Sequence, residues 1–360
     1  MTQKHLTVPA KLLQQQMALV FEAWGLPEAD ADITAEVLTR ADLMGIDSHG
    51  ITLLPLYDEL IRTGRLEPRA KIGIDRSFGA IAVIDGGGGF GQVPSVRAMD
   101  LAIEKAHAFG IGAVGVRNSN HYGAAGVYAL RAAERGLIGL STSAVYKPSI
   151  VPIFGREPRL GTNPLAFAAP GRHNRPFLLD MATSTIAIGK LKLAAREGRR
   201  LPEGWALDAH GQPQEDPSQA LLDRLMTPLG GSRMMGGHKG YGLAAMVEVL
   251  STLLPGASYA PLRAPDAARF DVGHFHMALH PDAFRDSGAF LDDLDAFIDC
   301  LHATHPADPD EPVRVPGDPE HETFERRSRE GVPVPHSLVQ AVAAIARECG
   351  ADFLLAQPAE

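Results

Sequence analysis

Three short stretches place histidine, lysine and hydroxyl side chains in glycine-bounded turns, where they could perform chemistry. The first, residues 47–50 (Asp-Ser-His-Gly), comes just after an apolar helical pattern. A serine beside a histidine in such a turn can polarise a carbonyl group or orient a proton donor. On its own this stretch is explained more simply as a helix cap, in which Asp47 or Ser48 accepts hydrogen bonds from free N–H groups.

The second stretch, residues 118–126 (NSNHYGAAG), lies between an apolar strand pattern and a helical pattern. Open α/β sheets bind ligands where their strands end, and small residues let a ligand approach the backbone. His121 could point out of this turn, and histidine is well suited to pass the proton that accompanies a hydride at neutral pH. The alternative is a capping turn with an ordinary surface histidine.

The third stretch, residues 236–243 (GGHKGYGL), opens a helical pattern. Free N–H groups at a helix start and the charge of Lys239 would converge on a phosphate, which predicts an anion site. No Ser or Thr follows Lys239 to bind magnesium, so this is not a Walker sequence. A plain glycine-rich helix start is the alternative.

A fourth pattern imitates a dinucleotide-binding turn. Gly86, Gly88 and Gly91 match G-x-G-x-x-G after a strand pattern. However, Gln92 and Pro94 occupy the helix start, and the next strand ends without an acidic residue to bind a ribose. We therefore predict a plain tight turn here.

Three histidines near the end of the chain have a spacing that could bind a metal ion. His274, His276 and His280 would face one side of a strand. Only Asp271 and Asp282 are close in sequence as further ligands, so packing or a position on a surface face is predicted rather than a metal site.

Composition excludes several classes of protein. A net charge of −9 and a pI near 5.9 argue against a broad nucleic-acid-binding or anionic-membrane surface. Two cysteines, Cys300 and Cys349, are too few for a disulfide framework, which favours a reducing compartment. No apolar run reaches the ~18 residues that span a membrane, and the first residues lack an apolar signal core. We expect a cytoplasmic protein.

These stretches must be positioned by alternating elements. Helical spacing of apolar residues dominates residues 9–65, and strands then alternate with helices from residue 68 onward. The polar, Pro- and Gly-rich residues 196–236 predict a surface excursion. An apolar helix is expected at 241–254, a strand at 270–279, helices at 292–302 and 337–349, and a loop at 306–323.

Taken together, the stretches resemble the malate/L-lactate dehydrogenase family that lacks a Rossmann fold. That family includes ureidoglycolate and sulfolactate dehydrogenases, diketogulonate reductase and piperideine-2-carboxylate reductases. The resemblance covers nearly the whole chain, in family order. The matching stretches are ADLMGIDSHGI (41–51), NSNHYGAAGVY (118–128), GTNPLAFAAP (161–170), LDMATSTIAIGK (179–190), GGHKGYGL (236–243) and RVPGDPE (314–320).

The resemblance implies roles for individual residues. Ser48 and His49 would be the proton relay and donor beside the substrate carbonyl, and His121, the acid/base in some relatives, would lie beside the nicotinamide. Thr162 would touch the substrate. Family members are typically homodimers. The implied NAD or NADP site consists of His121, Tyr122, Gly123, Ala124, Ala125, Asp180, Met181, Ala182, His238, Lys239, Pro316 and Gly317.

The chain departs from the family at two substrate positions. The family's Arg five residues after the serine is Leu53 here, and the frequent Arg-Gly-Lys is Ile188-Gly189-Lys190. Both losses remove guanidinium groups, the bidentate partners that a carboxylate prefers. Tyr57 is retained, and Lys147 lies in a loop that the family places near the site. Either Lys147 and backbone N–H groups hold the carboxylate, or the substrate differs from the usual one.

The sequence therefore predicts an α/β protein with a non-Rossmann mixed-sheet domain (residues 71–319) and a helical subdomain formed by residues 1–70 and 320–360. The expected activity is NAD(P)-dependent hydride transfer to or from a small 2-oxo or 2-hydroxy acid, with His49 or His121 passing the proton. One alternative is reduction of cyclic imine 2-carboxylates. Another, from a different class, is a ligand-binding protein without catalysis.

Overall fold

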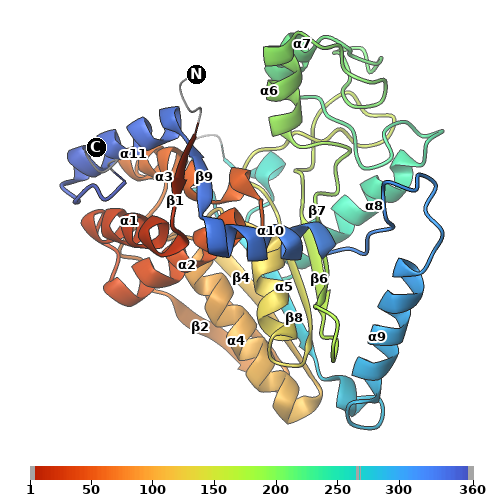
Figure 1. The fold of residues 1–360 in the computed structure, drawn as a ribbon. Coiled ribbons are helices and arrows are strands. Elements are labelled where there is room, and N and C mark those ends of the chain that lie inside the picture. Colours follow the sequence, from red (N-terminus) through yellow and green to blue (C-terminus); the bar gives the residue numbers. More distant parts are fainter. Residues whose placement is uncertain (1–4, 265–266, 268, 356–360) are drawn as a thin grey trace.

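A seven-stranded mixed sheet forms the centre of the computed structural model, which describes residues 5–264, 267 and 269–355 (Figure 1). The strand order is β2-β3-β4-β8-β5-β6-β7, and β3–β4 is the one parallel pair among the described residues. This confirms the predicted mixed-sheet α/β fold. The strands are β2 (Gly73–Phe78), β3 (Ile81–Asp85), β4 (Ile111–Ser119), β5 (Ile138–Ser143), β6 (Leu165–Ala169), β7 (Phe177–Met181) and β8 (Val272–Leu279).

Helices cover both faces of the sheet. On one face α4 (Gln92–Phe109) and α5 (Ala125–Ala133) pack side by side, and α2 (Glu28–Leu43) packs over them. On the other face lie α8 (Gly237–Glu248) and the π-helical turn that continues it, Val249–Leu253. Because β8 is paired on both edges at the centre, its side chains on either face are buried, including His274 and His276.

A second apolar core unites the two ends of the chain. Strand β1 (His5–Val8) pairs with β9 (Val332–Pro335), and buried residues of both termini share one cluster. The helices here are α1 (Ala10–Ala23), α2 (Glu28–Leu43), α3 (Leu54–Arg62) and α11 (His336–Cys349). The proposed division into two domains stays a prediction.

Residues 196–236 are anchored by a small core of their own. Leu201, Ala206, Ala220 and Met226 are buried against α6 (Ile188–Glu197), and α7 (Pro217–Asp223) forms within the segment. The polar composition hid these few apolar anchors. The segment is thus packed onto the sheet domain at defined points, although many of its side chains are exposed.

One expectation for the C-terminal part needs correction. The loop expected at 306–323 ends early, because α10 (Asp318–Glu330) begins inside it. This helix is almost entirely polar, so no apolar periodicity marked it. Short helical turns at Ala260–Leu262 and Pro281–Ala283 were also not expected. No helix in the described part of the chain is long and apolar enough to cross a membrane.

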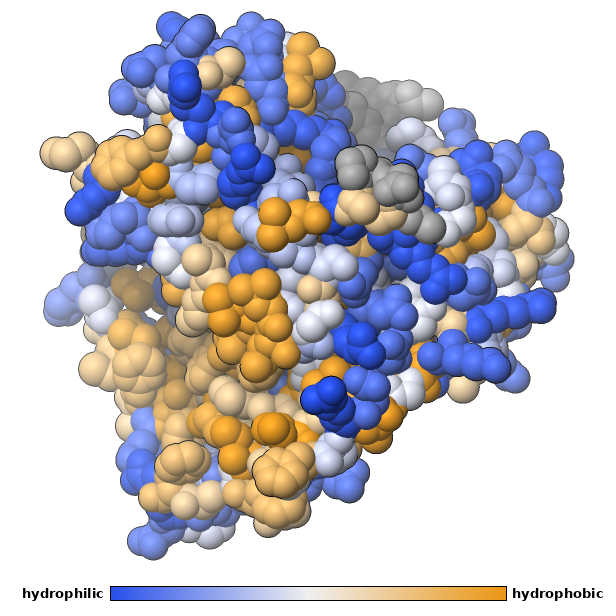
Figure 2. Space-filling model, turned by 180° about the vertical axis from the view of Figure 1, so that it is seen from behind, coloured by the Kyte–Doolittle hydropathy of each residue, from blue (hydrophilic) through white to orange (hydrophobic). Residues whose placement is uncertain are grey.

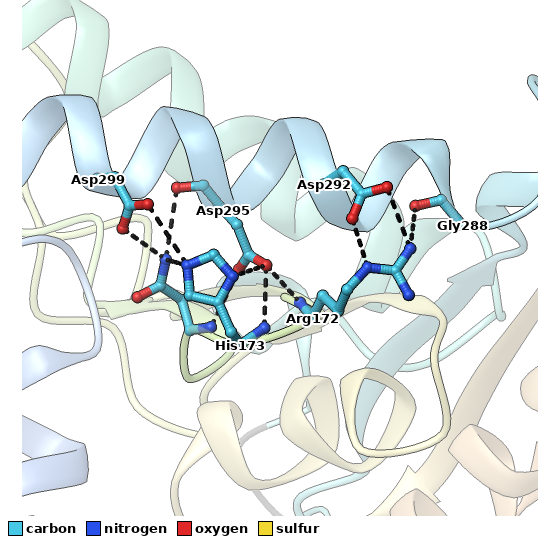
Figure 3. A network of polar contacts seen from close by, with 7 residues as sticks. Arg172, His173, Gly288, Asp292, Asp295 and Asp299 are labelled. Atoms are coloured by element: carbon cyan, nitrogen blue, oxygen red, sulfur yellow. Dashed lines mark hydrogen bonds and ion pairs between the residues drawn. The ribbon is translucent and has the colours of Figure 1, made fainter.

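Helix α9 (Ala289–His302) is attached by polar contacts rather than by a large apolar face (Figure 3). Its Asp295 is buried and accepts hydrogen bonds from the backbone N–H groups of Arg172, His173 and Asn174, at 2.9–3.1 Å. The His173 ring also lies 2.7 Å from the Asp295 carboxylate. We call Asp295 and residues 172–174 the α9 clamp.

Candidate functional site

A cavity of about 250 Å³ brings together side chains from distant parts of the chain. His49 and His121 lie on one wall. The lining contains no aspartate or glutamate, but it contains two cations. Its residues are His49, Leu56, His121, Tyr122, Gly123, Ser143, Ala144, Val145, Tyr146, Lys147, Ser149, Thr162, Pro164, Ile188, Arg224 and Val272.

The Ser48–His49 turn is tightly fixed by the residues beneath it. It forms a 3₁₀ turn, Asp47–His49, followed by a second, Ile51–Leu53, that leads into α3. The buried Asp42 carboxyl accepts a hydrogen bond from the Ile51 N–H at 2.8 Å. A Cβ at Gly50 would lie only 1.9 Å from that carboxyl, so glycine is required there.

Arg327 of α10 holds the same turn from the other side. Its guanidinium donates to the Asp42 carbonyl oxygen and pairs with the Asp47 carboxylate. Burial raises the pKa of the Asp42 carboxyl to about 8, against the lowering effect of the Ile51 hydrogen bond. The turn that carries His49 therefore rests on a neutral carboxylic acid at physiological pH.

His121 lies in the loop between β4 and α5, where a polar chain fixes its ring. Gly123 N–H donates to its Nδ1 at 3.3 Å, and the Tyr57 hydroxyl is 3.2 Å from the same nitrogen. Gln92 donates its amide to the Tyr57 oxygen, which leaves the Tyr57 proton free for His121. Nδ1 of His121 is thus an acceptor, and the neutral ring carries its proton on Nε2.

His49 has a different hydrogen-bonding environment. Its Nδ1 lies 2.8 Å from the Ser48 hydroxyl, which can either donate or accept. The His49 and His121 rings stack with centroids 5.6 Å apart. Burial lowers the pKa of His49, and burial together with the nearby His49 and His274 lowers the pKa of His121 to about 3. Both rings are therefore neutral at rest.

The buried histidines of β8 support the cavity from behind. His274 stacks on Tyr122 at 4.5 Å and lies within hydrogen-bond distance of Ser119 and Ser143. His276 is buried, and neither ring nitrogen has a hydrogen-bond partner among the described residues. Within the described part of the chain, no group of three His, Cys, Asp or Glu residues could hold a metal ion. The observed role of both histidines is packing.

The predicted substrate residues do not all reach the cavity. Lys147, Thr162 and Ile188 line it. Tyr57 is buried behind His121, Leu53 is buried outside the lining, and Gly189 is exposed beside it.

Apart from His238 and Lys239, the predicted cofactor residues fall into two groups. His121, Tyr122 and Gly123 line the cavity, and the buried Ala124 and Ala125 lead into α5. In the second group, Asp180 on β7 lies with Pro316 and Gly317 along a groove, and Met181 and Ala182 follow it.

Asp180 joins the two groups. One oxygen accepts from Gly126 N–H at 2.7 Å, at the start of α5. The other makes no hydrogen bond to a described residue, so it is free to accept one from a ligand hydroxyl. Burial raises the pKa of Asp180 to about 6.

His238 and Lys239 lie outside the main cavity, exposed at the N-terminus of α8. His238 Nδ1 is 2.9 Å from the Arg233 guanidinium. The preceding turn is joined to residues 183–185, directly after the Asp180 stretch, by the hydrogen bonds Leu229 N–H to Thr183 O and Gly231 N–H to Thr185 Oγ1.

The turn at Gly86–Gly91 does not offer its backbone to a phosphate. The N–H groups of Gly86, Gly87, Gly88, Gly89 and Gly91 all donate to protein oxygens, chiefly carbonyls of residues 117–121. The prediction of a structural turn rather than a dinucleotide-binding one is supported by this geometry.

Sequence reasoning missed Arg224, which lines the cavity from the far end of α7. It lies in the segment that was expected to be a surface excursion. One signal was available in the sequence: Leu53 stands where the family resemblance implies an arginine, which was a reason to look for an arginine elsewhere in the chain.

Comparison with known proteins agrees with this geometry. A model of the malate/L-lactate dehydrogenase family matches residues 8–343. The malate dehydrogenase of Pyrococcus abyssi is 39% identical over 98% of this chain and 97% of its own. The L-sulfolactate dehydrogenase of Methanothermobacter thermautotrophicus is 39% identical over 91% of this chain and 93% of its own. The crystal structure of malate dehydrogenase from Entamoeba histolytica superposes with a TM-score of 0.91, at 33% identity, over 97% of this chain and 99% of its own.

A more distant structural neighbour bears on the imine alternative. The Δ1-piperideine-2-carboxylate reductase of Pseudomonas syringae has a TM-score of 0.84 and 29% identity over 95% of this chain and all of its own. The dehydrogenases of hydroxy acids match this chain more closely on both measures.

Proposed function

The chain belongs to the malate/L-lactate dehydrogenase family, and we propose that it transfers a hydride between a nicotinamide cofactor and a small 2-hydroxy or 2-oxo acid. The observation that best supports this proposal is a pair of neutral histidines, His49 and His121, on one wall of a cavity. The two charged side chains that line this cavity are both cations. Cations favour an acidic substrate, and neutral histidines can accept or share the proton that accompanies the hydride.

The hydrogen bonds favour His49 as the residue that carries the proton. Oxidation removes one proton from the substrate hydroxyl, and reduction returns it. The Ser48 hydroxyl can accept from Nδ1–H or donate to Nδ1, so His49 can adopt the tautomer that either direction needs at Nε2. Ser48 is exposed, which gives the proton a path to solvent.

His121 is better suited to orienting the substrate. Both partners of its Nδ1 act as donors, so its Nε2–H is held as a fixed hydrogen-bond donor toward the cavity. Such a preorganised donor stabilises the negative charge that develops on the carbonyl oxygen. Lys147 and Thr162 are the proposed contacts for the substrate itself.

The residues present fit a nicotinamide dinucleotide that does not use a Rossmann turn. Asp180 has a free carboxylate oxygen suited to a ribose hydroxyl, and it lies between α5 and the groove of Pro316 and Gly317. Lys239 offers positive charge, and His238 a ring N–H, at a helix start for phosphate. A bound nicotinamide would supply the hydride acceptor or donor. NAD and NADP are both compatible with these groups.

We further propose a homodimer in the cytoplasm. The outer face of α8 and the π-turn exposes Met246, Val249, Leu253 and Leu254, with spacing that places them along one side. Figure 2 shows that the back of the molecule carries a broad apolar area. We propose that a second copy of this chain covers these exposed apolar side chains. Sedimentation of the intact protein, with a Leu253→Asp variant expected to be monomeric, tests this.

A substrate panel tests the activity itself. The absorbance of reduced nicotinamide is followed with NADH and NADPH against malate-type, lactate-type and sulfonated acids, and against cyclic imine carboxylates. Turnover of hydroxy acids supports the proposal. Turnover of imines alone would favour the alternative function, reduction of cyclic imine 2-carboxylates, which is the activity named for the Pseudomonas syringae neighbour. Turnover with none of the panel would reject both.

A further inference from the structure

Arg224 occupies a backbone conformation that an arginine rarely adopts. It ends α7 with φ 51° and ψ 41°, in the left-handed region, and its N–H donates to Ala220 O at 2.9 Å. Glycine is the favoured residue at such a helix end, and a side chain there costs about 1–2 kcal/mol of strain. Retained strain in a residue that lines a cavity is a reason to look for a function.

Within the described part of the chain, the Arg224 side chain has no protein partner that would explain its position. Among the described residues it forms no ion pair and no side-chain hydrogen bond, whereas most arginines of the chain are paired with a carboxylate. It is half-buried and lines the same cavity as His49 and His121. Its charge also reaches Tyr146, where it opposes the burial that raises the pKa of that phenol.

The backbone holds Arg224 and Lys147 close to the same cavity. Met226, two residues after Arg224, exchanges hydrogen bonds with the segment that follows Lys147: Met226 N–H donates to Ser149 O, and Val151 N–H donates to Met226 O, both at 2.9 Å. The two cations thus line one cavity with no carboxylate in the lining. A substrate with one anionic group can pair with only one of these two cations, of which Arg224 is half-buried and Lys147 is exposed.

We propose that Arg224 binds a second anionic group of the substrate, so that with Lys147 it selects 2-hydroxy acids with two anionic groups over monoacids. This inference rests on the proposed hydroxy-acid dehydrogenase activity. The planar guanidinium suits a carboxylate or sulfonate, which it can bind with two parallel hydrogen bonds. Arg224 is the one guanidinium among the described residues that line this cavity.

The substitution Arg224→Gly gives the most informative test, because it removes the positive charge and also relieves the backbone strain at this position. Kinetics of Arg224→Gly are measured with malate, which has two carboxylates, and with lactate, which has one. We expect KM for malate to rise about 10- to 100-fold, the range for a lost hydrogen bond to a charged group. KM for lactate and kcat for both acids should change less than about threefold, and the melting temperature should not fall.

Two further variants separate the role of Arg224 from a general effect of charge. Arg200→Gly is the matched control: it removes a cation from the same segment, where Arg200 pairs with Glu215 and does not line the cavity. It should leave the malate-to-lactate preference unchanged. Arg224→Lys should keep part of that preference, because the charge stays while the fork is lost.

The outcomes distinguish this inference from the activity on which it rests. If the unaltered protein oxidises no hydroxy acid, the proposed function fails. If it does so and Arg224→Gly keeps the same preference, or loses affinity for lactate as much as for malate, the second anion site is wrong. Calorimetric titration with malonate, which has two carboxylates and no hydroxyl to oxidise, gives a readout without turnover: Arg224→Gly should bind it more weakly than Arg200→Gly does.

Discussion

Asp42 and Asp295 are both 2% exposed, yet the structure treats their carboxyl groups in opposite ways. Asp42 lies under the His49 turn and receives one backbone N–H, so burial raises its pKa to about 8. Burial also opposes the charge of Asp295 in the α9 clamp. There, three backbone N–H groups and the adjacent His173 outweigh it and lower the pKa.

The difference has two causes: Asp42 lies deep under the turn with one backbone donor, whereas Asp295 lies beneath exposed side chains and has three backbone donors. In the α9 clamp, three backbone N–H groups donate to the Asp295 carboxylate, as expected of a contact that holds two segments together. In the site region, by contrast, Asp42, His49 and His121 are all neutral. The proposed proton carrier lies in this region, so its variants should change catalysis, whereas variants of the clamp should change stability.

The largest expected effect is on catalysis in the site region. His49→Gln should lower kcat by about 100- to 10,000-fold, because the proton carrier is lost, while the free energy of unfolding changes little. His121→Gln keeps a donor and should cost less. Stopped-flow reduction of the nicotinamide measures both. A larger loss in His121→Gln than in His49→Gln would assign the proton to His121 instead.

Next in size is a structural effect in the α9 clamp. Asp295→Ala leaves three backbone N–H groups without their acceptor and should reduce the free energy of unfolding by about 3 kcal/mol. Chemical denaturation measures the loss, and hydrogen exchange should show faster opening of α9. The rate of hydride transfer should stay within about twofold, since α9 does not line the cavity. Unchanged stability would mean that α9 is held mainly by its apolar contacts.

Much of the fold and part of the site were visible in the sequence, but the contrast between the two aspartates was not. The strands, the His49 and His121 turns and the packing role of His274 followed from periodicity and spacing. Asp42 was hidden because its partner, the Ile51 N–H, is a backbone group nine positions away. Arg224 and Asp295 act across long separations in the chain, through cores and hydrogen bonds that no local pattern encodes. The polar helix α10, which carries Arg327, gave no apolar signal.

The pH dependence of stability sharpens the comparison further. The folded pKa of Asp42, about 8, exceeds that of an unfolded aspartate, about 3.9, so its contribution is fully present below about pH 4 and is lost as pH rises through 8. Asp295 has the opposite sign: its contribution is present above about pH 4 and is lost in acid.

Asp42→Asn should therefore flatten the decline of unfolding free energy between pH 5 and pH 8, by about 1–3 kcal/mol over that window. Denaturation of the variant and the unaltered protein at four pH values measures this. Equal slopes in the two proteins would show that Asp42 is ionised throughout, and the contrast between the two aspartates would disappear.

The smallest expected effect tests which contacts of the α9 clamp matter. The His173 ring lies 2.7 Å from Asp295 and 3.4 Å from Asp299, but its side chain is 64% exposed. Exposed pairs contribute between zero and about 1 kcal/mol, whereas the backbone N–H of the same residue keeps its bond to Asp295 in any variant. His173→Gln should thus cost less than about 1 kcal/mol at low salt and almost nothing at high salt, measured by denaturation under both conditions. A loss as large as that of Asp295→Ala would show that the ring, rather than the three backbone donors, holds the acid in its charged form. The clamp would then depend on a titratable side chain, as the site region does.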